Sequence, residues 1–269
     1  MRQLGVWMMV VVSLVVRVPV ALAAPPSDVL AYALFGIEHA SVGGKARVQG
    51  DVGVLSNALE LGAGTRVTGL AAAPSITLGR NARVAGGFFC GTLDGSPDGC
   101  TTLPNPLIAT PSIVLVGPPS NSDVSAARRT KSTTPLAPGT YGALTIGAAA
   151  ELGLAGGTYQ FESIVLGSRA KLLCRAACDI TVRRRVRIGQ ATRLGAGDGV
   201  APGSVSLLIA AQDEATALEA KSRAQLRCSV YAPSAEVTIG AATKVTGALV
   251  GNTVTVGSRA RLQAPSGAP

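Results

Sequence analysis

Residues 76–84 read Ile76-Thr77-Leu78-Gly79-Arg80-Asn81-Ala82-Arg83-Val84, and residues 59–67 read Leu59-Glu60-Leu61-Gly62-Ala63-Gly64-Thr65-Arg66-Val67. In both, two apolar positions flank an outward one, a glycine follows, and a small residue precedes the next apolar strand position. The unit recurs along the chain, with its glycine position at Gly43, Gly62, Gly79, Gly147, Gly167, Gly189, Lys221, Gly240 and Gly257. Such internal repetition predicts stacked units that share one core.

The spacing of these units indicates the kind of stack. The glycine position steps by 19 and 17 residues near the start of the chain and again near its end, with steps of 68, 20, 22 and 32 between. One coil of a parallel β-helix takes about 17–25 residues, because it needs three short strands and three bends. We therefore predict an all-β fold, a parallel β-helix (β-solenoid) with coils of about 17–22 residues. We expect the glycine to supply the backbone conformation of the corner, and the small Ala or Thr to fit beneath it.

The repeats divide the chain into segments. We expect a leader in residues 1–23, solenoid coils in 24–89, an insertion or linker rich in Pro, Ser and Thr in 90–135, a second solenoid in 136–264 and a disordered tail in 265–269. The two solenoid blocks either stack end to end or are joined by a covering loop, and the sequence leaves both arrangements open.

The leader reads as a cleaved signal peptide. Arg2 precedes the apolar run Val6 to Val16, and Ala21-Leu22-Ala23 supplies a small-x-small cleavage pattern. An uncleaved membrane anchor is the competing interpretation, but Arg17 interrupts the run short of the roughly 20 residues that span a bilayer. We expect a secreted, periplasmic or cell-surface protein with no membrane span after cleavage.

The composition does not favour an enzyme. Only 14% of the residues are charged and 3% are aromatic, and the formal net charge is +9. A sugar-cleaving β-helix needs clustered carboxylates, and the acidic residues here never recur at one position of the repeat. We expect no catalytic residue, cofactor or metal site, and keep a polysaccharide-active β-helix enzyme as a less favoured alternative.

Outward threonines offer another alternative, a surface that binds ice. They occupy the position between the two apolar residues in four of the repeats and are interrupted by charged residues in others: Thr77, Thr145, Thr238 and Thr255. Threonine also forms strands readily, which accounts for it without ice.

The five cysteines are an odd number for an exported chain. Cys90 and Cys100 flank a turn-rich stretch, so we expect a disulfide that closes this loop. Cys174 and Cys178 either pair with each other, or one of them reaches Cys228. A zinc site is disfavoured because the single histidine, His39, is remote and no CxxC pair is present.

A basic stripe is the strongest candidate binding feature. The residue after each small Ala or Thr should point outward, and in most repeats it is basic: Arg47, Arg66, Arg83, Lys171, Arg193, Lys244 and Arg261. Stacked coils would set these side chains about 4.8 Å apart. Such a stripe either binds polyanions or is a solvated face that prevents lateral aggregation.

The second block resembles a family of secreted, pilus-associated bacterial β-helical domains. The matching segments are Leu136-Ala137-Pro138-Gly139-Thr140-Tyr141-Gly142, Gly156-Gly157-Thr158-Tyr159-Gln160-Phe161 and Ser229-Val230-Tyr231-Ala232-Pro233-Ser234-Ala235. The family is distantly similar to bactofilins, which polymerise, and to ice-binding-type adhesin domains. This chain departs from it in its many arginines and cysteines.

Together these features favour a non-catalytic structural or adhesive protein of the cell envelope that acts through its repetitive surface. A module that binds acidic polysaccharide, extracellular DNA or another polyanion through the basic stripe is the alternative. The resemblance to bactofilins adds end-to-end self-association as an expected form of partnership.

Overall fold

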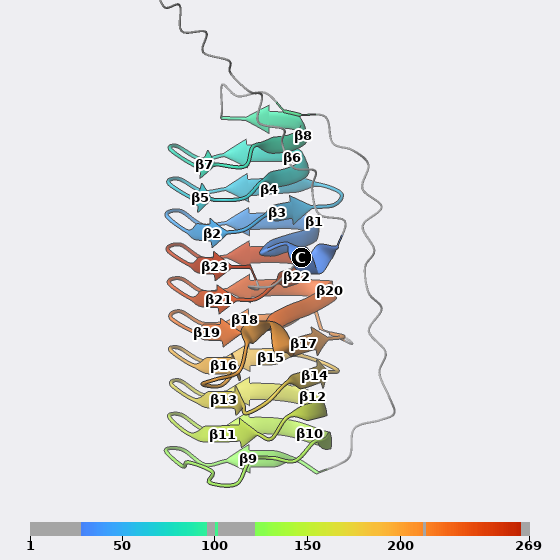
Figure 1. Cartoon of the computed structure of the whole chain (residues 1–269), viewed down its shortest axis with the longest axis vertical. Coiled ribbons are helices and arrows are strands. Elements are labelled where there is room, and N and C mark those ends of the chain that lie inside the picture. The colour runs from blue at the N-terminus through green and yellow to red at the C-terminus, as the bar shows by residue number, and fades with distance from the viewer. Residues whose placement is uncertain (1–27, 96–99, 102–121, 212–213, 265–269) are drawn as a thin grey trace, which may run out of the picture.

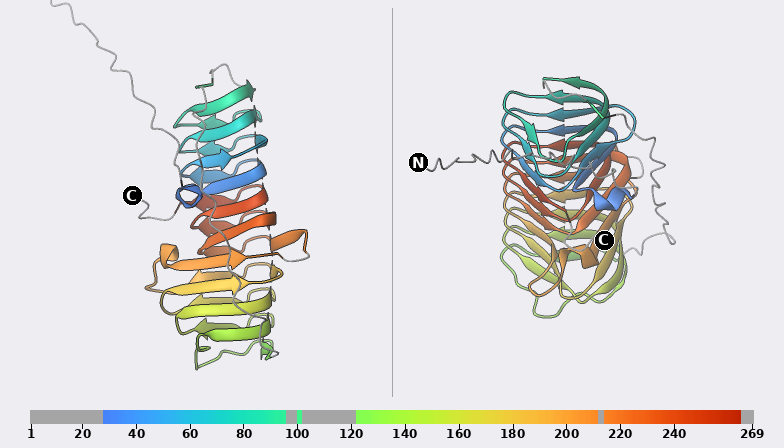
Figure 2. Two further views of the ribbon diagram at one scale, coloured as in Figure 1. Left: turned by 90° about the vertical axis from the view of Figure 1, so that its right-hand side faces the viewer. Right: turned by 45° about the horizontal axis from the view of Figure 1, so that its top comes forward.

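The protein is a β-solenoid of about ten coils (Figures 1 and 2). The computed structural model describes residues 28–95, 100–101, 122–211 and 214–264. Within these ranges every strand pairing is parallel, and the helical segments are two 3-10 turns, η1 (Val29–Ala31) and η2 (Pro202–Ser204). The fold class predicted from the repeats is confirmed. The expected signal peptide and the expected disordered tail lie outside the described residues.

No helix among the described residues combines the length and the apolar character that a bilayer crossing requires.

One face of the solenoid is a sheet of nine short strands, here called the short-strand sheet. Figure 1 shows these strands one above another along one side of the molecule. In spatial order they are β11 (Glu151–Leu154), β13 (Lys171–Cys174), β16 (Arg193–Ala196), β19 (Gln225–Arg227), β21 (Lys244–Thr246), β23 (Arg261–Gln263), β2 (Arg47–Gln49), β5 (Arg66–Val67) and β7 (Arg83–Val84).

The remaining faces belong to one sheet of 14 strands, here called the long-strand sheet, in which a coil contributes either one bent strand or two short ones. Its strands, in chain order, are β1 (Leu34–Val42), β3 (Val52–Val54), β4 (Ala58–Leu61), β6 (Ala71–Leu78), β8 (Phe88–Asp94), β9 (Val124–Ala126), β10 (Gly139–Ile146), β12 (Gly157–Leu166), β14 (Cys178–Val182), β15 (Val186–Ile188), β17 (Val205–Ile209), β18 (Thr216–Ala220), β20 (Ser229–Ile239) and β22 (Leu249–Val256).

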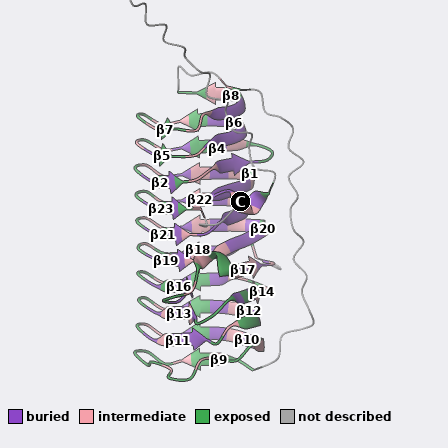
Figure 3. Ribbon diagram, viewed as in Figure 1, coloured by how far each residue is buried: buried purple, intermediate pink, exposed green. Residues whose placement is uncertain are grey.

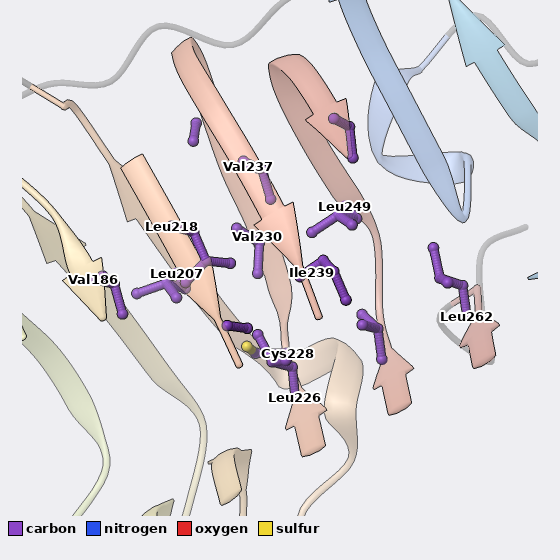
Figure 4. Close-up of a cluster of buried hydrophobic side chains, with 14 of the residues drawn as sticks. Val186, Leu207, Leu218, Leu226, Cys228, Val230, Val237, Ile239, Leu249 and Leu262 are labelled. Carbon is purple, nitrogen blue, oxygen red and sulfur yellow. The ribbon is translucent and has the colours of Figure 1, made fainter. Parts of the chain in front are cut away.

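The core is the interior of the tube. Alternation along each strand sends every second side chain inward, where aliphatic residues of successive coils form continuous rows. Figure 3 marks the buried residues along the strands of the stack. Figure 4 shows one such region, in which Val186, Leu218 and Val237 come from three successive coils and are all fully buried. Burying an aliphatic side chain of this size contributes about 1.5–3 kcal/mol, so the narrow repeat suits the Val, Leu, Ile and Ala of this sequence.

The corner glycines are needed for a different reason from the one expected. Their φ angles are not positive; instead, a side chain there would collide with the neighbouring coil. A Cβ added at Gly43 would lie 2.6 Å from the Ser258 backbone nitrogen, and one at Gly257 would lie 2.6 Å from that of Ala241. Glycine therefore allows close approach of backbones rather than an unusual conformation.

The unusual conformation falls two residues after the glycine. At this position Lys45, Asn81, Ala242 and Arg259 have φ between 57° and 60°, in the left-handed region. The backbone N–H of this residue donates to a carbonyl of the next coil, as in Arg259 N–H to Gly44 O at 3.0 Å. A ladder of turn hydrogen bonds thus runs beside the sheets.

The two blocks stack, but in an order that the sequence does not reveal. The last coil lies directly on the first: β22 pairs with β1 and β23 pairs with β2, an interface here called the seam. In Figure 1 the red C-terminal strands therefore lie beside the blue N-terminal ones in the middle of the solenoid. The two outer ends are β8 and β9. From the middle of the solenoid the first block coils out to the β8 end. The second block begins at the β9 end and coils back to the middle.

The seam is bonded like any other layer. Gly43 N–H donates to Val256 O at 2.6 Å, Arg47 N–H to Ala260 O at 2.9 Å, and Ala264 N–H to Gln49 O at 2.8 Å. The core rows also continue across it, since Ala40, Val42, Val254 and Val256 are all buried.

The solenoid extends into both ends of the stretch in which composition favours a linker. Strand β8 reaches Asp94, and β9 begins the second block at Val124 rather than at 136. The β9 coil fits the repeat except that Ala127 stands at the glycine position. Gly147 in the next coil packs on the Ala127 and Arg128 backbone. Strand β9 is at the end of the sheet, and within the described residues no earlier coil lies against the Ala127 Cβ.

A disulfide joins Cys90 to Cys100 beside the other end strand. It returns the chain to β8, where Thr101 N–H donates to Phe88 O at 2.9 Å and Cys90 N–H donates to Thr101 O at 3.2 Å. Thr101 therefore covers part of the β8 edge, which would otherwise expose unpaired backbone groups.

Candidate functional site: a cation column on the short-strand sheet

The basic residues singled out from the sequence lie in one straight column on the outside of the short-strand sheet. Each is the first residue of its strand, and the strands pair in register, so the side chains stack directly above one another. The column, in spatial order, is Lys131, Glu151, Lys171, Arg193, Gln225, Lys244, Arg261, Arg47, Arg66 and Arg83. We call it the cation column.

Charge is not uniform along the column. Towards the β9 end, Glu151 lies between two lysines and forms ion pairs with both, at 3.8 Å to Lys131 and 3.1 Å to Lys171. Glu151 is the one acidic residue in the nine strands of the short-strand sheet. One carboxylate offsets one of the two lysine charges, so this part of the column is less positive than the rest.

Across the seam the column carries five consecutive cations, which we call the five-cation run: Lys244, Arg261, Arg47, Arg66 and Arg83. All five side chains are exposed. Within the described residues none of them forms an ion pair. At about 4.8 Å per strand the run is about 19 Å long.

The five-cation run exists only because the two ends of the chain meet. Lys244 and Arg261 come from the C-terminal block, and Arg47, Arg66 and Arg83 from the N-terminal block. The sequence indicated a stripe, but not that its two strongest parts are contiguous. No local sequence signal reports the order in which the blocks stack.

The other arginine cluster of the sequence is mostly paired with acids. Arg185 lies 3.1 Å and Arg184 lies 3.5 Å from Glu214, and Arg187 lies 3.9 Å from Glu219. This cluster belongs to the β14–β15 corner, which the β17–β18 coil supplies with carboxylates. It is a less suitable anion site than the five-cation run.

A second outward column lies beside the five-cation run. Thr246, Gln263 and Gln49 occupy the third position of β21, β23 and β2, and they too are in register. Between the two columns lies a shallow groove of about 290 Å³ that crosses the seam. Guanidinium and ammonium groups line one side of it, and amides with a hydroxyl line the other.

The outward threonines of the long-strand sheet form a broken array. Thr238, Thr255 and Ser41 follow one another on adjacent strands. Glu219 precedes Thr238 and Glu60 follows Ser41, so acidic residues end this polar group on both sides. The Glu236 carboxylate accepts hydrogen bonds from Thr238 at 3.0 Å and from Thr255 at 3.5 Å. Thr77 and Thr145 lie elsewhere in the same column.

Cys174, Cys178 and Cys228 are buried in the core as free thiols. A hydrogen bond between the Cys174 and Cys178 side chains, together with burial, raises the pKa of Cys174. Burial alone raises the pKa of Cys228 to about 12. The same hydrogen bond lowers the pKa of Cys178. Burial shields all three thiols from solvent, and the raised pKa values keep Cys174 and Cys228 protonated. Within the described residues, no group of three His, Cys, Asp or Glu side chains is placed to hold a metal ion.

The fold and this surface define a class: a parallel β-solenoid with one strongly cationic face. Comparison of the chain with protein-family models, curated proteins and solved structures found no match.

Proposed function

We propose that this protein is a non-catalytic adhesive solenoid of the cell envelope that binds acidic polymers along its cation column. One observation carries the proposal: five exposed cations stand in register without an acidic partner among the described residues. The export signal expected from residues 1–23 places such a surface where extracellular polyanions occur.

Electrostatics explains why this arrangement favours a ligand. Neighbouring cations about 4.8 Å apart repel each other by roughly 1 kcal/mol per pair even in water. A polyanion that lies along the column relieves this repulsion at every coil and releases its own counterions on binding. The rigid stack of strands also fixes the spacing of the cations before the ligand binds, so less conformational entropy is lost on binding.

The proposal is tested by removing charge from the run. The variant Arg47→Gln/Arg66→Gln/Arg83→Gln should bind immobilised acidic polysaccharide at least tenfold more weakly at low salt. The magnitude of the slope of log affinity against log salt concentration should decrease by about 2–3, because the variant loses three cationic contacts with the ligand.

A matched control removes the same charge elsewhere. Arg128→Gln/Arg169→Gln/Arg175→Gln changes three exposed arginines of the C-terminal block, far from the run. It should retain near-native affinity. Equal losses in both variants would mean that net charge alone causes retention, and unchanged binding in the first variant would contradict the proposal.

A second candidate function is structural, through end-to-end association of solenoids. The observation that favours it is a hollow of about 530 Å³ at the β8 end, whose lining includes Leu78, Val84 and Phe88. Analytical ultracentrifugation at increasing protein concentration tests it. Filaments shortened by Val84→Glu would support this role, and a monomer at all concentrations would oppose it.

A further inference from the structure

We propose that the ligand of the five-cation run is a linear polyuronate, a polysaccharide with one carboxylate on every sugar, lying parallel to the solenoid axis and across the seam. This inference rests on the polyanion-binding function proposed above and specifies its ligand.

The spacing favours a sugar chain over nucleic acid. One coil advances by about 4.8 Å, and a pyranose ring with its linking oxygen advances an extended polysaccharide by a similar length. The sugar repeat and the coil repeat are therefore close in length, so a carboxylate that turns towards the sheet at any coil of the run lies near a cation. Phosphates of a DNA strand advance about 3.4 Å along the helix axis and leave a straight column as the helix turns.

The side chains favour carboxylates. Four of the five cations are arginines, whose planar guanidinium donates two parallel hydrogen bonds to a carboxylate. The nine strands of the short-strand sheet contain no aromatic residue on which a nucleobase could stack. The surface thus offers strong sites for carboxylates and none for bases.

The groove supplies partners for the neutral part of a sugar. The amides of Gln49 and Gln263 and the hydroxyl of Thr246 stand opposite the cations across the groove of about 290 Å³. Amides and hydroxyls both donate and accept hydrogen bonds, as sugar hydroxyls do. Over the three coils of this groove, a sugar chain therefore meets charge on one edge and amide or hydroxyl partners on the other.

The run has two definite ends, which sets a ligand length. At one end the neutral Gln225 separates it from Arg193, and at the other end β7 is the last strand of the short-strand sheet. Affinity should rise with chain length until about five sugars cover the run, and then level off.

Calorimetric titration of the full chain with oligogalacturonates of two to eight sugars tests this. We expect affinity to increase with chain length and to reach a plateau near five sugars. The variant Gln225→Arg joins Arg193 to the run, so its plateau should move to about seven sugars. Arg128→Gln, an exposed arginine outside the cation column, should leave the wild-type plateau unchanged.

The controls separate the ligand class from the general function. Methyl-esterified oligogalacturonates, which lack the charge, should not bind. If a sulfated polymer or single-stranded DNA binds more tightly and the uronates show no plateau, the polyuronate inference is wrong while polyanion binding stands. If no polyanion binds at low salt, both are wrong.

Discussion

Arg47 of β2 and Arg261 of β23 lie in register on adjacent strands, although one is near the start of the chain and the other near its end. Both are exposed, and Arg47 has Arg66 as its other neighbour in the column. The seam therefore brings like charges together at the place where the two halves of the chain meet. A fold that maximised stability alone would not concentrate repulsion there, which is why we attribute the cations to binding.

The first prediction concerns this repulsion. Arg47→Gln should raise the midpoint of thermal unfolding by about 4–8 °C at low ionic strength, because it removes two like-charge contacts of the column at roughly 1 kcal/mol each. At 1 M salt the Debye length is about 3 Å, and the gain should disappear. Arg128→Gln, an exposed arginine outside the run, should change the midpoint by much less. A gain that persists at high salt would show that repulsion is not its cause.

The second prediction concerns chain order. A circular permutant that begins at Ser122, continues through Ala264 and a flexible linker to Asp28, and ends at Thr101 would follow the coils in their spatial order. We expect it to keep the native circular dichroism spectrum and bind acidic polysaccharide with wild-type affinity, because the seam becomes an ordinary covalent step between coils. An unfolded or non-binding permutant would argue that the blocks are not stacked in this order.

The third prediction concerns the turn ladder. Ala242 has a φ of 57°, a conformation that costs an alanine roughly 1–2 kcal/mol and a glycine very little. Ala242→Gly should therefore raise the free energy of unfolding by about 1 kcal/mol in urea titrations. Ala241→Gly, one residue earlier and without a positive φ, should lower it by about 0.5–1 kcal/mol. Equal effects of the two substitutions would contradict the assigned backbone conformations.

The fourth prediction concerns the cysteines. A thiol reagent at pH 8 should not label the native protein, because Cys174, Cys178 and Cys228 are buried and the pKa of Cys228 is raised to about 12. Unfolding in denaturant should expose three reactive thiols and leave one disulfide, Cys90–Cys100. A single reactive thiol would instead support a second disulfide, formed by two of the buried cysteines.

The same thiol gives a pH dependence. The folded state keeps the Cys228 proton up to about pH 12, whereas the unfolded thiol loses it near its ordinary value of about 9. The proton thus binds the folded state more tightly, so this contribution is complete below about pH 9 and declines as the pH rises towards 12. Cys228→Ala should reduce the loss of stability between pH 8 and pH 10.

Much of the fold could be predicted from the sequence, because the residue pattern within each coil determines which side chains face the core and where the chain turns. The alternation in Val237-Thr238-Ile239 sets the inward face, and Gly240 marks the corner. The glycine at this position was predictable, but its reason was not, since the close approach is to the backbone of Ser222 in another coil. The β9 coil was missed for the same reason: Ala127 stands at its glycine position, where no earlier coil among the described residues lies against it.

The candidate site was predictable only in part. Outward positions such as Arg66 and Arg83 follow from strand alternation, and they were identified as a stripe. The adjacency of Arg47 and Arg261 depends on which coil stacks on which. Repeats with the same residue pattern can pair in several orders, and the local sequence does not distinguish these orders. Only the three-dimensional structure therefore reveals the five-cation run.

The five-cation run depends on the seam between β23 and β2, and a double-cysteine variant tests this pairing directly. Gln49 and Gln263 are exposed partners on β2 and β23, with Cα atoms about one strand spacing apart, within reach of a disulfide. Gln225 lies three strands from Gln49 in the same sheet. After mild oxidation, Gln49→Cys/Gln263→Cys should yield a monomer in which peptides from the two ends of the chain are linked, and Gln49→Cys/Gln225→Cys should not. Failure of the first pair to link within a molecule, or equal linking by the second, would contradict the seam and the cation run built on it.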